Sequence, residues 1–243
     1  MARALFVFFV VFAYLFLVGP ICIVYAVLRG NADILYRVGR LGCCMGIKLA
    51  GITLNIKGRS HVDPKKTYLF LANHQGNCDP PALLLAIPQN VKFMVKKELN
   101  KVPVLNIVMR LGDFVFIDRK NRPSALQGMN QAVTQMQRGD SFLVFPEGTR
   151  TRNGKMGPFK KGPFLMALQA GVSILPITIS GSYEVMPPTK FRLTPGTITV
   201  TFHPKIETRG LSPSSREALM QEVRRTIRSE LEETERPILN ARN

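Results

Sequence analysis

The chain has 243 residues, of which 46% are hydrophobic, and this length is enough for one sizeable core with an appendage. Its 33 Lys and Arg against 16 Asp and Glu give a formal net charge of +17, which predicts an anionic partner such as a membrane surface, a phosphorylated substrate or nucleic acid. The four cysteines and three histidines show neither a disulfide framework nor a metal-binding spacing. A disulfide-stabilised secreted domain and a metal site are therefore not predicted, and a reduced, cytosol-facing compartment fits best.

The N-terminus is predicted to anchor the chain in a membrane. Residues 4–28 contain no charge and are flanked by Arg3 and Arg29, and a spanning helix needs ~20 apolar residues. The core of a cleaved signal peptide is usually ~7–15 residues, so this run is too long for one. Two alternatives stay open, a single spanning helix and a segment that enters one leaflet and returns, because Gly19-Pro20 permits a kink.

A second helix is expected over residues 32–50, where one face is apolar and Arg37, Arg40 and Lys48 are interspersed. This pattern suits a helix in the lipid headgroup region and equally an amphipathic helix packed on a soluble domain. Because cations are abundant after the apolar run, the positive-inside rule predicts that the rest of the chain is cytoplasmic. We expect a hydrophobic two-helix membrane module at 1–51 and a globular domain at 52–243.

Beyond residue 51, short apolar runs alternate with helical patterns. Strands are expected at 52–56, 67–72, 91–95, 113–117, 141–145, 172–180 and 197–202, and helices at 79–87, 103–110, 124–138, 162–170 and 214–235. This alternation predicts an α/β fold, with a mixed β-sheet flanked by helices.

Polar side chains follow three of the predicted strands. His74 and Asp79 follow the second strand, Asp118 and Arg119 follow the fourth, and the segment 147–150 follows the fifth. Ligands of α/β proteins bind outside the carboxyl ends of the strands, so these loops are expected to converge on one cleft.

A histidine and a carboxylate at one strand end can form a general base and its orienting partner. Alone, His74 could equally be a turn residue, and Asp79, followed by two prolines, could be a helix cap. Arginine side chains match phosphate oxygens with two hydrogen bonds, whereas Glu147 has a structural alternative, an ion pair with Arg150. Nothing near Cys78 indicates a depressed thiol pKa, so a small buried thiol is expected there and not a nucleophile.

Four segments resemble the motifs of the glycerolipid acyltransferases, in the same order and at the same spacing. Residues 73–79, NHQGNCD, resemble the first motif NHxxxxD, and residues 145–150, FPEGTR, resemble the third. Residues 112–119 are similar to the second motif, and 175–177 with the small-residue turn 180–182 are similar to the fourth. A departure is Gly76, where the family more often has serine. The resemblance covers about 52–202 and is closest to the 1-acyl-sn-glycerol-3-phosphate acyltransferases of bacteria.

The resemblance implies transfer of an acyl chain from acyl-CoA or acyl carrier protein to the 2-hydroxyl of lysophosphatidic acid, giving phosphatidic acid at the cytoplasmic face of the inner (plasma) membrane. It implies direct transfer without an acyl-enzyme, and no metal or cofactor besides the acyl donor. His74 would be the general base and Asp79 its orienting partner. The implied phosphate-binding residues are Arg119, Glu147, Gly148, Thr149 and Arg150, with Lys96 and Pro176 as further substrate contacts.

Two alternatives remain at this point. The same chemistry could act on another lyso-lipid or on glycerol-3-phosphate, because loops outside the motifs set the acceptor. A non-enzymatic basic protein that binds membranes or nucleic acid is the other. Nucleic-acid modules usually interleave aromatic with basic residues, but here the aromatic residues concentrate in 6–25 and in strand cores. The predicted partners are therefore the lipid acceptor, the acyl donor and an anionic membrane surface, and not nucleic acid.

Overall fold

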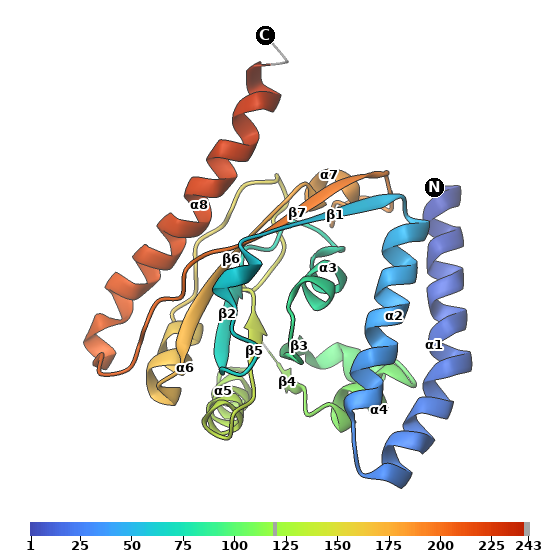
Figure 1. The fold of residues 1–243 in the computed structure, drawn as a ribbon, viewed down its shortest axis with the longest axis horizontal. Helices are drawn as coiled ribbons and strands as arrows, with labels where there is room; N and C mark the ends of the chain where they lie inside the picture. Colours follow the sequence, from blue (N-terminus) through green and yellow to red (C-terminus); the bar gives the residue numbers. More distant parts are fainter. Residues whose placement is uncertain (119–120, 241–243) are drawn as a thin grey trace.

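A seven-stranded sheet forms the centre of the fold (Figure 1). The computed structural model describes residues 1–118 and 121–240, with side chains up to Leu231. The strands are β1 (Ile52–Lys57), β2 (Tyr68–Ala72), β3 (Lys92–Lys96), β4 (Val115–Ile117), β5 (Phe142–Val144), β6 (Ser173–Ser180) and β7 (Gly196–Phe202). Their order is β1-β7-β6-β2-β5-β3-β4. Only the β6–β7 pair is antiparallel within the described strands, so the predicted mixed sheet is confirmed.

Helices cover both faces of this sheet (Figure 1). The helices are α1 (Ala2–Arg29), α2 (Asp33–Leu49), α3 (Asp79–Ala86), α4 (Leu105–Leu111), α5 (Arg122–Gln137), α6 (Gly162–Ala170), α7 (Ser182–Val185) and α8 (Arg216–Asn240), with 3-10 turns η1 (Arg59–His61), η2 (Lys97–Lys101) and η3 (Pro213–Ser215). The first three helices pack on one face, and α5, α6 and α8 pack on the other. The predicted α/β fold is confirmed.

The central strand β2 shows why the core is stable. Its side chains alternate, with Tyr68, Phe70 and Ala72 in the cluster below α1–α3 and Leu69 and Leu71 in the cluster below α5, α6 and α8. Such a continuous apolar run is typical of a parallel strand that is covered on both faces. Full burial of each large apolar side chain contributes roughly 1.5–3 kcal/mol to the stability of the fold. The strand is therefore held firmly in the core, and its end sets the position at which the following loop begins.

Helix α1 is continuous and packs against the globular domain. Near its start, Arg3 donates a hydrogen bond to the Ala50 carbonyl (3.5 Å) and the Phe8 ring stacks on Phe191 at 5.4 Å. Further along, Gly19 lies so close to Val104 that a Cβ would stand 2.5 Å from the valine Cγ1. Gly19-Pro20, which permits a kink, does not break the helix, and the chain reverses instead after Arg29.

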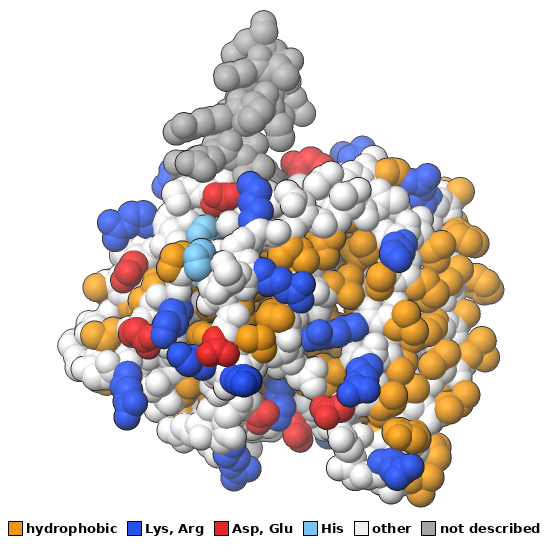
Figure 2. All heavy atoms as spheres, viewed as in Figure 1, with side chains coloured by type: hydrophobic (Ala, Val, Ile, Leu, Met, Phe, Trp, Pro, Cys, Tyr) orange, Lys and Arg blue, Asp and Glu red, His pale blue; other side chains and the backbone are white. Residues whose placement is uncertain are grey.

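The outer side of α1 is apolar and exposed, as Figure 2 shows at the right of the view. Its exposed large side chains are Leu5, Phe6, Phe9, Phe12, Phe16, Leu17, Ile21, Val24, Tyr25, Val27 and Leu28. The helix is 28 residues long, or about 42 Å at 1.5 Å per residue. Among the described residues it is the one helix that is long and apolar enough to cross a membrane.

Helix α2 returns antiparallel to α1 and joins it to the sheet (Figure 1). The Tyr14 hydroxyl donates to the Val38 carbonyl at 2.9 Å, and Gly42 lets the Tyr14 ring approach α2 closely. Ile47 of α2 and Ala4 of α1 belong to the same buried cluster as Phe70 of β2. The two N-terminal helices therefore share the core of the domain that follows them, and β1 begins at Ile52.

Candidate active site

Four parallel strands bring the predicted site residues to one edge of the sheet. β2, β5, β3 and β4 are neighbours, and His74, Glu147, Lys96 and Asp118 stand at or just beyond their carboxyl ends. The loops after β2 and β5 meet, because the Glu147 carboxylate accepts the His74 amide, whereas convergence of the loop after β4 on the same cleft stays a prediction. Arg119 lies outside the described residues.

His74 and Asp79 form a close pair. The His74 Nδ1 lies 2.7 Å from the Asp79 Oδ2, and the two side chains are 14% and 0% exposed. Because a carboxylate only accepts hydrogen bonds, Nδ1 carries the shared proton, which leaves Nε2 as the ring nitrogen that can accept another. The same Asp79 oxygen accepts the Gln75 and Gly76 amides at 2.7 and 2.9 Å. This carboxylate therefore fixes both the imidazole and the turn that carries it.

Asp79 does not cap helix α3, so that part of the prediction is wrong. The cap position is Cys78, and no side chain caps the helix start. The Asp79 carboxylate points back to the preceding turn instead, and its Oδ1 is buried without a hydrogen-bond partner among the described residues. The helix start still benefits from the negative charge in its first turn.

Glu147 holds the His74 backbone. Its Oε1 accepts the His74 amide at 2.7 Å, and its Oε2 accepts the Gly157 amide at the same distance. Burial raises the pKa of Glu147 above its ordinary value, against the lowering by the hydrogen bonds from Gly157 and His74. The alternative ion pair with Arg150 is not what the structure shows, because Arg150 donates to the Asn77 Oδ1 instead.

Sequence reasoning gave no role to two residues that shape the site. The Phe145 ring stacks under the His74 ring, with centroids 3.8 Å apart and planes 13° from parallel. The buried Asn73 side chain exchanges two hydrogen bonds of 2.8 Å with the Ile179 backbone, so it ties the end of β2 to β6. Both residues are the first of their motifs, but the stacking depends on β2 and β5 being neighbours, which sequence spacing does not reveal.

The loop after β5 folds back over the His74 turn. Gly148 has φ +74°, a conformation that favours glycine, and its amide closes a turn onto the Phe145 carbonyl. The Thr151 amide donates to the His74 carbonyl at 2.9 Å. Thr149 and Arg150 are exposed at this turn, with Arg150 bonded to Asn77 of the His74 turn. An exposed cation thus stands beside the candidate base.

Close packing explains why this chain has Gly76 where the family more often has serine. A Cβ on Gly76 would lie 2.4 Å from the Ser182 carbonyl oxygen of α7, too close for any side chain. The next residue, Asn77, donates its amide to the Met186 carbonyl at 3.1 Å. The His74 turn therefore lies directly on α7, an element that the sequence analysis did not predict.

The remaining predicted residues lie in different surroundings. Lys96 ends β3 with a 60% exposed side chain whose Nζ is 3.2 Å from Glu98. Pro176 is buried inside β6, in register with Leu71, on the sheet side that α8 covers. Its carbonyl accepts the His203 amide, and His203 lies just beyond the end of β7. The carbonyl and the amide position of a strand residue point to the same side, so the N–H that Pro176 lacks would also lie beyond β7, and no hydrogen bond between the strands is lost. Substrate contact by Lys96 and Pro176 stays a prediction.

Cys78 is a buried thiol, as predicted. Burial raises its pKa to about 12, with a further increase from Asp79. Its Sγ lies 3.9 Å from the Met186 Sδ. A thiol held protonated in this way is a poor nucleophile.

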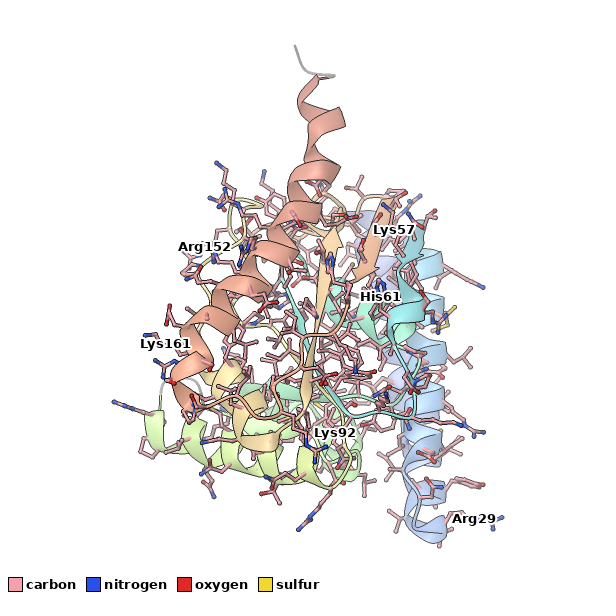
Figure 3. The ribbon with its side chains drawn as sticks, turned by 60° about the vertical axis from the view of Figure 1, so that its left-hand side comes forward. Arg29, Lys57, His61, Lys92, Arg152 and Lys161 are labelled. Carbon is pink, nitrogen blue, oxygen red and sulfur yellow. The ribbon has the colours of Figure 1, made fainter. Side chains whose placement is uncertain are left out.

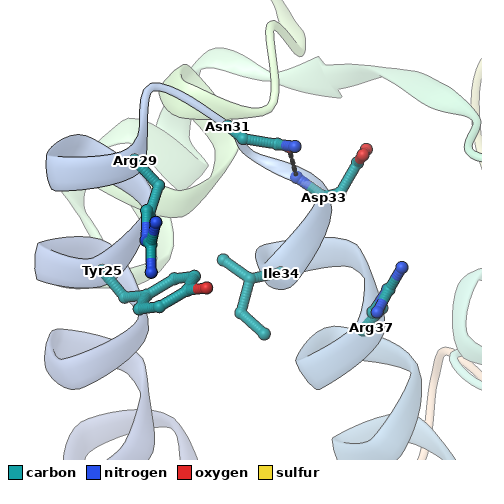
Figure 4. A pocket seen from close by; sticks show the side chains of 6 residues that line it. All are labelled: Tyr25, Arg29, Asn31, Asp33, Ile34 and Arg37. Carbon is teal, nitrogen blue, oxygen red and sulfur yellow. Dashed lines mark hydrogen bonds between the residues drawn. The ribbon is translucent and has the colours of Figure 1, made fainter.

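Other cations lie apart from the His74 pair (Figure 3). The Lys161 Nζ is 3.6 Å from the Glu217 carboxylate at the start of α8, and Arg29 lies at the far end of the N-terminal helices. A cavity of about 420 Å³ opens there (Figure 4), lined by Tyr25, Arg29, Asn31, Asp33, Ile34 and Arg37. All its lining residues belong to α1, α2 and their connection, so this cavity is separate from the His74 site.

The chain is similar to a family of known enzymes. Residues 53–180 match the family model described as "Acyltransferase". The 1-acyl-sn-glycerol-3-phosphate acyltransferase alpha of Mus musculus is 33% identical over 210 residues, which are 86% of this chain and 72% of the mouse protein. The human protein of the same name is 34% identical over 74% of this chain, which spans only 64% of the human protein's length.

Bacterial proteins are similar over more of their length. The 1-acyl-sn-glycerol-3-phosphate acyltransferase of Borreliella burgdorferi is 30% identical over 76% of this chain and 74% of its own. The crystal structure of the 1-acyl-sn-glycerophosphate (LPA) acyltransferase PlsC from Thermotoga maritima superposes with a TM-score of 0.86 and 25% identity. That match covers 96% of this chain and 95% of the other.

Proposed function

Because this chain belongs to the acyltransferase family, we propose that it acylates the 2-hydroxyl of 1-acyl-sn-glycerol-3-phosphate to give phosphatidic acid. The relatives named above carry that activity in their names. The observation that carries the proposal is the pair of His74 and Asp79, in which a buried carboxylate holds one ring nitrogen at 2.7 Å.

The proposed mechanism is direct transfer. His74 Nε2 takes the proton of the lipid hydroxyl while the hydroxyl oxygen attacks the thioester carbonyl carbon. Asp79 stabilises the imidazolium that forms. The tetrahedral intermediate then collapses, the carbon–sulfur bond breaks, and the imidazolium returns its proton to the departing thiolate. No acyl-enzyme is needed, which agrees with the high pKa of Cys78. Acyl-CoA or acyl carrier protein supplies the thioester, and the reaction needs no further cofactor.

Arg150 is proposed to bind the acceptor's phosphate, together with Arg119. Arg150 is exposed beside the His74 turn, and a guanidinium matches phosphate oxygens with two hydrogen bonds. Glu147 is proposed to act on the protein and not on the phosphate, because both its oxygens accept backbone amides. Gly148 and Thr149 shape the turn that presents Arg150.

The test is an acyl-transfer assay with the purified full-length protein in phosphatidylcholine vesicles. Lysophosphatidic acid, glycerol-3-phosphate and lysophosphatidylcholine are offered as acceptors, with acyl-CoA of several chain lengths or acyl carrier protein as donor. We expect phosphatidic acid to be the preferred product. Faster acylation of lysophosphatidylcholine, which has no phosphate monoester, or of glycerol-3-phosphate would contradict the proposal.

Arg150→Ala should raise the KM for lysophosphatidic acid about tenfold. Hydrogen bonds to charged groups contribute ≈ 1.5–3 kcal/mol, and about 1.4 kcal/mol is a factor of ten. The KM for the acyl donor should stay unchanged, and Arg152→Ala, on the same loop, is the matched control. An increase confined to the donor's KM would instead assign Arg150 to the donor.

We further propose that α1 lies in one leaflet on the cytoplasmic side and does not cross the bilayer. It contacts the globular domain near its start, at Arg3, and again beyond its middle, at Gly19, so a crossing helix would draw polar surface into the hydrocarbon. The exposed apolar side of α1 is long enough to lie along the membrane. Arg29 over the Tyr25 ring suits the headgroup level, where arginine and tyrosine are common.

Phe9→Glu combined with Leu17→Glu should lower the vesicle-bound fraction about tenfold or more, because two charges would enter the hydrocarbon boundary. Flotation with phosphatidylglycerol-containing vesicles measures this. Leu126→Glu, which replaces an exposed leucine of α5, is the control and should bind normally. A cleavable N-terminal tag should remain on the same side of inverted membrane vesicles as the globular domain, whereas a tag on the opposite side would mean that α1 crosses.

A further inference from the structure

Helix α8 contacts the loop over the active site through Arg224. The Arg224 Nη1 donates a hydrogen bond to the Gly157 carbonyl oxygen, 2.6 Å away, and the guanidinium lies over the Phe159 ring, 5.4 Å from its centroid. Phe159 is itself buried and stacks on Phe164 of α6 at 6.3 Å. Arg224 thus fixes the end of this loop by a hydrogen bond and by a cation–π contact.

Gly157 connects this contact to the candidate base. Its amide donates to the Glu147 Oε2 at 2.7 Å, and the Glu147 Oε1 accepts the His74 amide at 2.7 Å. A Cβ on residue 157 would lie 3.1 Å from that Oε2, so glycine allows the close approach. A series of hydrogen bonds therefore runs from α8 through Gly157 and Glu147 to the His74 backbone.

Glu147 needs its partners because it is only 6% exposed. If Gly157 moved away, one carboxylate oxygen would be buried without a donor, which is unfavourable for a charged group. The loop contains glycines at 148, 154 and 157, and its 152–155 part is mostly exposed. Met156 and Phe159 pack on the buried cluster on either side of Gly157, and the hydrogen bond from α8 adds a direct constraint on the Gly157 peptide itself.

Helix α8 does not need Arg224 for its own packing. It is held by an apolar row of buried side chains, which are Leu219, Met220, Val223, Ile227 and Leu231. Arg224 is half-buried at the margin of this row. Its removal should therefore leave the helix in place and affect the loop.

We propose that Arg224 is a positioning residue for acyl transfer, which holds Gly157 and Glu147 so that His74 keeps its place between Phe145 and Asp79. This inference rests on the proposed function for its kinetic readout. Arg224 touches neither substrate in the proposed mechanism, so its effect belongs to kcat and not to KM. A displacement of about 1 Å of a catalytic group costs up to ~10²-fold in rate.

The variants are Arg224→Met, which keeps the apolar stem and removes the donors, and Arg224→Lys, which restores one donor. Arg225→Ala, which removes the adjacent exposed arginine of the same helix, is the control. We expect Arg224→Met to lower kcat roughly 10–100-fold with both KM values changed less than about threefold, Arg224→Lys to recover part of the loss, and the control to be normal. Normal kcat in Arg224→Met, a loss confined to KM, or a variant that does not fold would each overturn the proposal.

A double-mutant cycle tests the route through Glu147. Arg224→Met should lower kcat little further in a Glu147→Gln background, because the two residues act in one series. Fully additive losses would overturn the proposal.

A second readout does not depend on catalysis. The chain has three histidines, so imidazole signals in ¹H–¹⁵N NMR spectra are few, and the His74→Ala spectrum assigns the His74 signal. Arg224→Met should shift that signal and leave those of His61 and His203, whereas an unchanged His74 signal would overturn the proposal. If the wild type does not acylate lysophosphatidic acid, the proposed function fails while this NMR test of the hydrogen-bond series still stands.

Discussion

Replacing His74 with alanine is expected to lower the turnover of lysophosphatidic acid acylation ~10²–10⁴-fold, the usual contribution of a general base. In the structure, the His74 Nδ1 lies 2.7 Å from the Asp79 carboxylate, and the imidazole ring stacks on Phe145. In the proposed mechanism, the lipid hydroxyl of this variant would have to give its proton to water. The two KM values should change little, because neither the phosphate contact nor the acyl site is touched.

The His74 measurement has two controls. His61→Ala removes an exposed histidine and should leave turnover normal. Free imidazole should partly restore the activity of His74→Ala, because the space over the Phe145 ring is left open in that variant. Near-normal turnover of purified His74→Ala would contradict the mechanism.

Asp79→Asn should lower kcat by about 10² or more while the turn stays intact. The asparagine oxygen can take the place of Oδ2 and accept the same three donors, from His74, Gln75 and Gly76. Its amide group then takes the place of Oδ1, which has no partner within the described residues. The variant therefore removes the negative charge that stabilises the imidazolium and keeps the geometry.

The stability of Asp79→Asn separates charge from folding. A buried amide without an acceptor costs ≈ 1–3 kcal/mol, and each kcal/mol lowers the Tm by ≈ 2–4 °C for a chain of this size. A modest decrease in Tm with a large decrease in kcat supports the role of the charge. If the Asp79→Asn variant turned over lysophosphatidic acid nearly as fast as the wild type, the role of Asp79 would be limited to shaping the turn.

The sequence was sufficient for the strands, for the helices other than α7, and for the residues at the strand ends. Apolar runs such as 67–72 and 172–180 give the strands because burial on both faces leaves no polar position to confuse the pattern. The pair of His74 and Asp79 follows from one local turn, so a short stretch of sequence contains it. Strand 113–117 begins only at Val115, because Asp113 takes a φ of +55° that a strand does not accommodate.

Long-range contacts were beyond the sequence. The position of Glu147 under the His74 amide requires β2 and β5 to be neighbours. The hydrophobic periodicity of the sequence does not determine the order of the strands. The same holds for Phe145 below the imidazole and for Arg224, which is 77 positions after Glu147 in the sequence. Pairing Glu147 with Arg150 was the local alternative, and it was wrong because backbone amides satisfy the buried carboxylate.

The shared core of the N-terminal helices limits how this enzyme can be made soluble in water. Ala4, Val7 and Ile47 fill the same cluster as the sheet, so a shortened chain starting at Ile52 would uncover part of its own interior and aggregate. The outer side of α1 does not contribute to this core. Recoding that side with polar residues, while leaving the inward-facing ones untouched, is the route to a soluble catalyst for lipids dispersed in detergent.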